Sequence, residues 1–217
     1  MLSPKVAIVD YGVGNLFNVQ RALESIGANA AISSDSAEIL GAERLVVPGV
    51  GAFAEGMKGL QERGLAGPIR EFAASGRPIL GICLGAQLML THSEEHGTHA
   101  GLDLVKGLVV ALRQPVSGGE QYKIPQIGWN SLRLPDYASG SLWDNTILRG
   151  LTGEPSVYFL HTYITTLHDP RASIAVTEYG HDRFCSVFQS KNISGIQPHP
   201  ERSGQVGLQI LKNFLEQ

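Results

Sequence analysis

Short runs of apolar residues without polar alternation dominate the first ninety positions. They cover residues 5–11, 28–33, 44–48 and 78–83. A run of this kind predicts a strand that is covered on both faces, as in a parallel sheet between two layers of helices.

The stretches between these runs show helical spacing. Leu16, Val19 and Leu23 recur every three or four residues, so we expect a helix that ends at Gly27. Further helices are expected around residues 57–65, where Gly64 and Gly67 interrupt the pattern, and over residues 68–75 and 84–91.

The pattern changes after residue 95. Short strands separated by turns are predicted, several of them alternating apolar and polar residues as antiparallel strands do. They cover residues 102–112, 131–134, 157–160, 174–177, 185–188 and 193–196. A helix is expected over residues 205–217 and a surface loop over residues 135–153. The whole pattern predicts one α/β domain with a mixed sheet.

The run 78–83 ends in a sequence that could carry chemistry. Gly81 and Gly85 stand two positions on either side of Cys83, which is the spacing of a nucleophile elbow. A nucleophile on a tight strand-to-helix turn leaves no room for side chains at these two positions. A buried structural cysteine at the end of a strand would look similar, so this stretch alone leaves both interpretations open.

Composition limits the alternatives only modestly. The 217 residues carry a formal net charge of −3, which gives no basic surface for nucleic acid or an anionic membrane. Cys83 and Cys185 are too few and too far apart for a disulfide framework or a metal cluster. With neither a signal-peptide pattern nor an apolar run of spanning length, we expect a cytosolic chain with reduced thiols. Gly12-Val13-Gly14 resembles the start of a dinucleotide fingerprint, but position 17 is Phe where that motif needs a third glycine.

One of the seven histidines stands out as a partner for Cys83. His199 lies between two prolines, and Glu201 follows two residues later. Because residues i and i+2 of an extended chain point to the same side, Glu201 can reach the ring of His199 and orient it as a base. His92, His96 and His99 lie in a polar stretch that predicts a solvated loop, and His161 follows an apolar strand.

A thiol that attacks a carbonyl also needs donors for the oxyanion. The N–H of Leu84, directly after Cys83, is one natural donor. The loop Gly49-Val50-Gly51 follows the neighbouring strand and could supply the other, because glycines let a peptide N–H turn toward the site.

These motifs together resemble the class I (triad) glutamine amidotransferases, and within them the glutaminase subunit of imidazole glycerol phosphate synthase. The resemblance rests on blocks that start at Asp10, Pro48, Gly81, Ile127, Tyr158 and His199 and cover nearly the whole chain. It implies a flavodoxin-like fold with a central mixed, mostly parallel sheet, and a single type 1 domain over residues 1–217.

The resemblance also implies a mechanism and site residues. Cys83 would attack the side-chain amide of glutamine, with His199 as base and acid and Glu201 as its orienter. The oxyanion would bind Leu84 and either Val50 or Gly51. Gly49, Gln87, Thr162 and Tyr163 match positions that hold glutamine.

A partner belongs to this picture as well. The family passes ammonia to a cyclase subunit with a (β/α)8 barrel, as a heterodimer, and needs no metal or cofactor for glutamine hydrolysis. The cyclase makes imidazole glycerol phosphate and AICAR in histidine biosynthesis. Asn15 and Trp129 match positions on the partner-facing side, although a helix cap and a core aromatic residue would explain them equally well.

The chain departs from the family pattern at three places: Pro198 replaces an aromatic residue, Thr162 replaces a serine, and Gln126-Ile127 replaces His-Met. Three alternatives stay open: a related glutaminase outside histidine synthesis, a cysteine hydrolase of the DJ-1/PfpI type, and a binding domain that keeps the fold without the activity. The first differs in its partner, the second leaves Gln87 and the His199–Glu201 pair without a role, and the third expects the loss of a triad residue.

Overall fold

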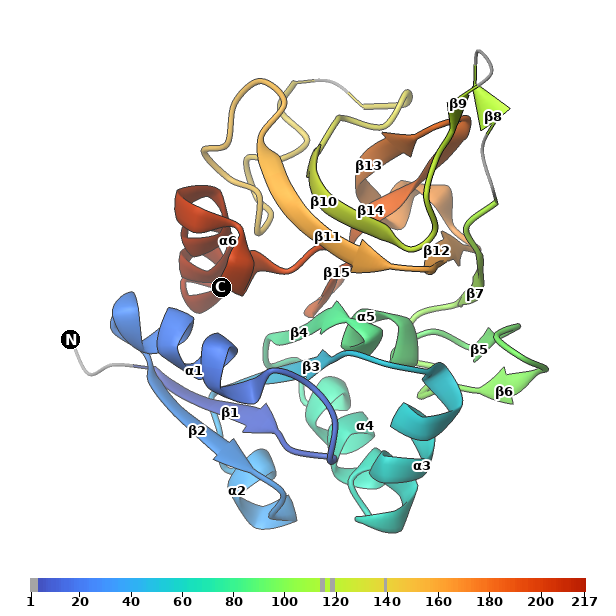
Figure 1. The fold of residues 1–217 in the computed structure, drawn as a ribbon. Helices are drawn as coiled ribbons and strands as arrows, with labels where there is room; N and C mark the ends of the chain where they lie inside the picture. The colour runs from blue at the N-terminus through green and yellow to red at the C-terminus, as the bar shows by residue number, and fades with distance from the viewer. Residues whose placement is uncertain (1–3, 114–115, 118–119, 139) are drawn as a thin grey trace.

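The computed structural model describes residues 4–113, 116–117, 120–138 and 140–217. Its first half alternates strands and helices (Figure 1): β1 (Lys5–Val9), α1 (Leu16–Ser25), β2 (Asn29–Ser33), α2 (Ser36–Leu40), β3 (Arg44–Gly49), α3 (Phe53–Glu62), α4 (Ala66–Ala74), β4 (Ile79–Cys83) and α5 (Leu84–Leu88).

The second half consists mainly of strands and closes with a helix. Its elements are β5 (His92–Ser93), β6 (His99–Ala100), β7 (Gly107–Ala111), β8 (Val116–Ser117), β9 (Glu120–Gln121), β10 (Gln126–Ser131), β11 (Ser156–His161), β12 (Tyr163–Leu167), η1 (Pro170–Ala172), β13 (Ser173–Tyr179), β14 (Asp182–Ser190), β15 (Ile193–Ile196), η2 (Pro200–Arg202) and α6 (Gly204–Leu215).

The central sheet is mixed, as predicted. Among the described residues it has eleven strands, in the order β2-β1-β3-β4-β15-β14-β12-β7-β5-β6, with β13 paired to β14. The strands from β2 to β15 are parallel, and β15 joins the second half through its antiparallel pairing with β14. Strand β4 therefore lies between β3 and β15, which places the end of β4 near the middle of the sheet.

Two apolar layers cover the two faces of this sheet. Val6 and Ile8 of β1 pack in the same cluster as residues of α1 and α6, whereas Ala7 and Val9 pack with α3 and α4. Figure 1 shows α1 and α6 side by side on one face and α3 and α4 on the other. Successive side chains of a strand point to opposite faces of the sheet. Because both faces are buried here, the strands of the first half show no alternation of apolar and polar residues.

Most predicted elements are confirmed, and the differences have physical reasons. The elbow helix ends at Leu88 instead of Thr91, because the chain turns there so that the N–H groups of Leu102 and Asp103 can bond to the carbonyls of Leu88 and Leu90. The strand expected over residues 102–112 begins only at Gly107, and the strand expected over 131–134 lies at Gln126–Ser131. Gly67 lies inside α4 and does not interrupt it.

The expected surface loop over residues 135–153 is partly wrong. Its described residues form turns, yet Trp143, Ile147 and Leu148 are buried in the core cluster that contains α6. The indole N–H of Trp143 donates to the carbonyl of Ile174 at 2.7 Å, and the side chain of Asn213 caps two carbonyls of this segment. The segment therefore contributes to the core, although its described residues form no helix or strand.

Candidate active site

The turn between β4 and α5 holds Cys83 in a strained backbone conformation. Cys83 has φ 53° and ψ −112°, a region that L-residues rarely adopt. A Cβ at Gly81 would lie 2.6 Å from the Cα of Ala86, and a Cβ at Gly85 would overlap the carbonyl oxygen of Val47. The two glycines are therefore required by the close packing of the turn, as the elbow spacing predicted.

His199 and Glu201 meet beside this turn. The Nδ1 of His199 lies 2.8 Å from Oε1 of Glu201, and the two side chains are 4% and 2% exposed. His199 has the expected extended backbone, but Glu201 belongs to the 3-10 turn η2, so this turn brings the carboxylate to the ring. The pairing was predicted correctly, and the geometric reason given for it was incomplete.

The charges around His199 favour its protonated form. Burial lowers the pKa of His199, but its interactions with Cys83 and Glu201 outweigh burial and raise the pKa to about 10. Its Nε2 makes no hydrogen bond, while the thiol of Cys83 donates to the carbonyl of Leu160 at 3.6 Å. The attraction to Cys83 that helps to raise this pKa acts on an ionised sulfur, so the protonated ring is the partner of a Cys83 thiolate.

The loop after β3 lies on the other side of Cys83. Register pairing sets Gly49 opposite Cys83, and the hydroxyl of Tyr11 donates to the carbonyl of Pro48 at 2.6 Å. A Cβ at Gly49 would overlap that hydroxyl oxygen. Gly51 is exposed, has φ +114° and leaves open space where its Cβ would be, so this end of the loop is much less crowded.

A cavity of about 350 Å³ opens above the elbow. Its lining contains most of the predicted site residues and a few others: Val50, Gly51, Cys83, Leu84, Gln87, Glu95, Pro125, Leu160, His161, Thr162 and Tyr163. The structure thus brings the elbow, the oxyanion loop and the Thr162-Tyr163 strand end to one cavity of a size that suits a small molecule. Gly49 lies beneath the loop, where it contacts Tyr11 and Leu84.

Glu95 is a cavity residue that the sequence did not reveal. Its carboxylate is buried and accepts the N–H of Phe53 at 2.6 Å. Glu95 lies in the polar stretch around His92 and His96. A sequence pattern of this kind cannot distinguish an acidic residue in solvent from one that lies in the wall of a cavity. Its backbone N–H bonds to the buried hydroxyl of Ser93, which fixes this turn.

Gln87 and Gln197 form a second polar group next to the thiol. The Nε2 of Gln87 donates to the carbonyl of Tyr163 at 3.0 Å and to Oε1 of Gln197 at 2.9 Å. The Nε2 of Gln197 lies 3.6 Å from the sulfur of Cys83. Gln197 was also missed, since its role depends on the pairing of β15 with β4.

His161 is buried in the wall of the cavity and is neutral at physiological pH. Burial lowers its pKa to about 4. Its Nδ1 lies 3.0 Å from the carbonyl of Tyr163, so the proton of the neutral ring is on Nδ1. Nε2 lies 3.1 Å from the side chain of Gln126. His161 therefore supports the strand end of Tyr163 and connects it with β10.

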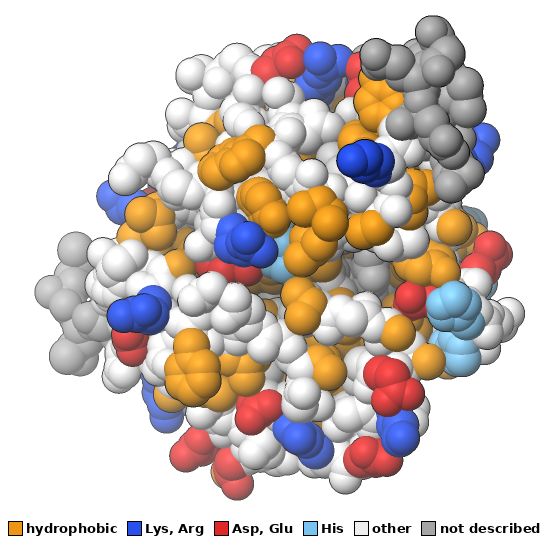
Figure 2. Space-filling view, in the orientation of Figure 1, with side chains coloured by type: hydrophobic (Ala, Val, Ile, Leu, Met, Phe, Trp, Pro, Cys, Tyr) orange, Lys and Arg blue, Asp and Glu red, His pale blue; other side chains and the backbone are white. Residues whose placement is uncertain are grey.

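The two residues matched to the partner side are both exposed. Trp129 is 59% exposed, which excludes the alternative of a core aromatic residue, and Ile127 on the same strand is equally exposed. Asn15 stands at the N-cap of α1, but its side chain makes no capping bond. Figure 2 shows hydrophobic side chains gathered on this face, over β10 and β11 and again over α1.

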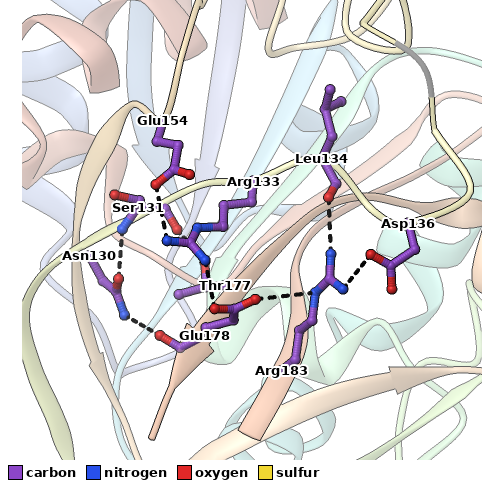
Figure 3. A network of polar contacts seen from close by, with 9 residues as sticks. All are labelled: Asn130, Ser131, Arg133, Leu134, Asp136, Glu154, Thr177, Glu178 and Arg183. Carbon is purple, nitrogen blue, oxygen red and sulfur yellow. Dashed lines mark hydrogen bonds and ion pairs between the residues drawn. The ribbon is translucent and has the colours of Figure 1, made fainter. Parts of the chain in front are cut away.

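Polar contacts fix the strand that carries Trp129. Figure 3 shows Asn130 donating to the carbonyl of Glu178 at 2.8 Å and Thr177 donating to the carbonyl of Ser131 at 2.9 Å. Arg133 pairs with the carboxylate of Glu178 at 2.6 Å. Because β13 belongs to the central sheet, these contacts attach the small sheet β10–β11 to it.

The described residues offer neither a membrane-spanning helix nor a cluster of metal ligands. No helix in that part of the chain is long and apolar enough to cross a membrane. Nor do three or more His, Cys, Asp or Glu side chains come together there as they would around a metal ion.

Comparison with known sequences defines the class of protein. The model of the family "Glutamine amidotransferase class-I" matches residues 7–217, and the chain belongs to this family. Solved structures show the same fold. A structure described as a glutamine amidotransferase has a TM-score of 0.69 at 17% identity and covers 97% of both chains. PurLQS from Thermotoga maritima also has a TM-score of 0.69, at 19% identity, with 99% of this chain and 98% of that chain covered.

More similar relatives define the group within the family. Imidazole glycerol phosphate synthase subunit HisH 1 of Legionella pneumophila (strain Paris) is 46% identical over 211 residues, 97% of this chain and 98% of that protein. Subunit HisH of Methanosarcina acetivorans is 46% identical over 215 residues, 98% of both chains. The chain groups with these HisH subunits, and it is a glutamine-hydrolysing amidotransferase subunit of the imidazole glycerol phosphate synthase type.

Proposed function

We propose that Cys83 is the nucleophile of this glutaminase and that His199 and Glu201 complete its triad. The observation that carries the proposal is the 2.8 Å contact between His199 and Glu201 beside a cysteine held in a strained elbow. A strained backbone of this kind persists where the surrounding structure enforces it, which is typical of functional sites.

The reaction follows from the positions of these groups. In the reacting state the proton of the Cys83 thiol lies on Nε2 of His199, because the raised pKa favours the protonated ring, and the thiolate attacks the side-chain amide carbon of glutamine. His199 returns the proton to the amide nitrogen, and the C–N bond breaks. Ammonia is released, and the γ-glutamyl group remains bound to Cys83 as a thioester. A water molecule, deprotonated by His199, then attacks the thioester and releases glutamate and the thiol.

The oxyanion forms between the elbow and the loop after β3. The N–H of Leu84 and an N–H of Val50 or Gly51 stabilise it, and loss of one such donor costs about 3 kcal/mol. The open space at Gly51 would let this peptide turn as the oxyanion forms.

Glutamine is held by the rest of the cavity wall. The buried carboxylate of Glu95 suits the α-ammonium group of an amino acid, since a cation next to it offsets the cost of its burial. Gln87 and the backbone at Thr162 and Tyr163 border the same cavity and contact the remaining polar groups of the substrate.

A cyclase subunit with a (β/α)8 barrel receives the ammonia in a heterodimer. The exposed apolar residues of β10, Ile127 and Trp129, support this part of the proposal because exposed apolar patches mark interaction sites. Asn15, at the N-cap of α1, and Trp129 belong to the docking face.

The experiment measures glutamate released from glutamine by the chain alone and with the cyclase subunit and its ligand. We expect weak release alone and strong stimulation by the cyclase, with both lost in Cys83→Ala. Stimulation only by a different cyclase-like partner would contradict the pathway and leave the glutaminase chemistry intact. Full activity in Cys83→Ala would contradict the mechanism.

A further inference from the structure

We infer that Gln197 is a fourth catalytic side chain, which stabilises the thiolate of Cys83 through a hydrogen bond, and that Gln87 holds Gln197 in the orientation needed. This inference rests on the proposed function, because it assigns roles around the same nucleophile. The sequence motif around His199 does not specify it; it follows from the contacts between strands.

Strand register places Gln197 beside the nucleophile. Ile196 of β15 pairs with Ile82 of β4, so the next residues along the two parallel strands, Gln197 and Cys83, lie side by side. The N–H of Gln197 donates to the carbonyl of Ser186 at 2.8 Å, which holds the backbone, and its side chain is buried. Its Nε2 is 3.6 Å from Sγ of Cys83, a normal distance for a hydrogen bond to sulfur.

The backbone carbonyl of Tyr163 determines how the side-chain amides of Gln87 and Gln197 are oriented. Tyr163 offers an oxygen that can only accept, so the group of Gln87 that contacts it at 3.0 Å must be the amide nitrogen. The same nitrogen lies 2.9 Å from Gln197, which must therefore present its oxygen there. The remaining end of the Gln197 amide, the NH2 group, faces the sulfur. A reversed amide would place donor against donor.

This donor matters because Leu160, another neighbour of the sulfur besides His199, favours the thiol. In the described arrangement the thiol donates to the carbonyl of Leu160, which cannot stabilise a thiolate. Cys83 is also only 5% exposed, so water contributes little. When the proton moves to His199, Gln197 is the neighbouring side chain that offers the negative sulfur a neutral donor, and donors to ionised acceptors form the stronger hydrogen bonds.

The test is the pH dependence of Cys83 alkylation by iodoacetamide, without glutamine. The label is counted by mass spectrometry on the Cys83 peptide, and Cys185 provides an internal reference because burial raises its pKa to about 11. Gln197→Glu keeps the size and the acceptor toward Gln87 but replaces the donor with a carboxylate. Gln197→Met removes the donor without adding charge.

We expect both variants to move the midpoint of the pH–rate profile upward, by about one pH unit in Gln197→Met and further in Gln197→Glu. Gln87→Met, which releases the Gln197 amide, should move it in the same direction by less. Glutaminase kcat should fall about tenfold in Gln197→Met, with a smaller change in KM. Gln61→Glu, an exposed glutamine of α3, controls for the added charge and should leave the midpoint unchanged.

An unchanged midpoint in Gln197→Met would by itself overturn the inference, because the methionine side chain has no proton to donate. Folding of each variant is checked by its near-ultraviolet circular dichroism, and Gln87→Met decides the matter if Gln197→Met does not fold. Failure of the proposed function would look different: the midpoints would move as expected while the wild-type chain with its cyclase released no glutamate.

Discussion

The two sides of Cys83 differ in how tightly the structure constrains them. On one side, the elbow packs so closely that neither Gly81 nor Gly85 could carry a Cβ without overlap or severe crowding. On the other side, the loop after β3 begins crowded at Gly49 and becomes open at Gly51, where an added Cβ would meet nothing within 4 Å.

The two sides of Cys83 serve different purposes: one side positions the nucleophile and its base, and the other side supplies donors for the oxyanion. The backbone of the nucleophile and the ring of its base are held by close packing and by a buried carboxylate. The oxyanion donors on the loop are not fixed in the same way. We therefore expect substitutions on the elbow side to damage the fold and the chemistry together, and substitutions on the loop side to affect mainly the activated state.

The largest effect should follow from Gly85→Ala. The added methyl overlaps the carbonyl oxygen of Val47, and both backbones belong to the packed centre of the sheet. We expect a loss of about 3 kcal/mol or more in the free energy of unfolding, measured by urea denaturation. Gly67→Ala is the matched control, because it lies inside α4 with open space around it and should stabilise the chain by about 0.5–1 kcal/mol. An equal effect at both positions would remove the steric argument for the elbow.

The second-largest effect should follow from a change of Glu201, the carboxylate that orients His199. Glu201→Gln keeps the shape but removes the charge that favours protonated His199, and kcat/KM should fall roughly 10²–10⁴-fold. Initial rates of glutamate release with the cyclase present measure it. A variant with wild-type rates would show that His199 needs no orienter.

The same variant has a pH-dependent effect on stability. Cys83 and Glu201 together raise the pKa of His199 from 6.5 to about 10, so the stabilisation that these two partners give the protonated ring is complete below pH 6.5 and is lost as the pH rises through about 10. The variant should lose about 3 kcal/mol at pH 6 and less above pH 10, measured by urea denaturation at both pH values. A difference that grows with pH would have the wrong sign for this pair.

Trp129→Ala should have a smaller effect, which is limited to the binding of the cyclase. Truncation of an exposed aromatic anchor typically costs about 2 kcal/mol of binding energy, so about thirtyfold more cyclase should be needed for half-maximal stimulation. Basal glutaminase activity should not change. Tyr137→Ala, at another exposed aromatic residue, should leave both quantities unchanged. Loss of basal activity in Trp129→Ala would contradict the separation between the docking face and the elbow.

The smallest effect on stability should follow from Gly51→Ala. The new side chain has space, but φ +114° is strained for alanine, so we expect a loss of about 1 kcal/mol in unfolding free energy. Stimulation by the cyclase should fall more than basal activity, which glutamate release with and without the partner compares. A loss as large as that of Gly85→Ala would show that the loop is as constrained as the elbow.

The sequence predicted those parts of the molecule that depend on local pattern. Strand β15 was predicted at its observed bounds, and the elbow and the His199–Glu201 pair were found because their spacing has a steric or geometric meaning. Helix α2 was missed, although Asp35 and Glu38 form a capping pattern at its start. It is five residues long, too short for periodicity to show.

Other features depend on tertiary contacts. Strand β10 was placed too late because Gly128 and Asn130 interrupt its apolar pattern, and its partner strand stabilises it instead. In the sequence, Glu95 and Gln197 look like ordinary polar residues. In the fold, Glu95 lines the cavity and Gln197 lies beside Cys83. Local sequence carries no information about either contact.

Covalent labelling by a substrate analogue tests whether Cys83 is the nucleophile. The wild-type chain is incubated with a glutamine analogue that carries an electrophilic γ-carbon, and the modified peptide is identified by mass spectrometry. We expect one label, on Cys83, that excess glutamine prevents and that Glu201→Gln slows. A label on Cys185, or a label on Cys83 that glutamine does not prevent, would overturn the assignment of Cys83 as the nucleophile.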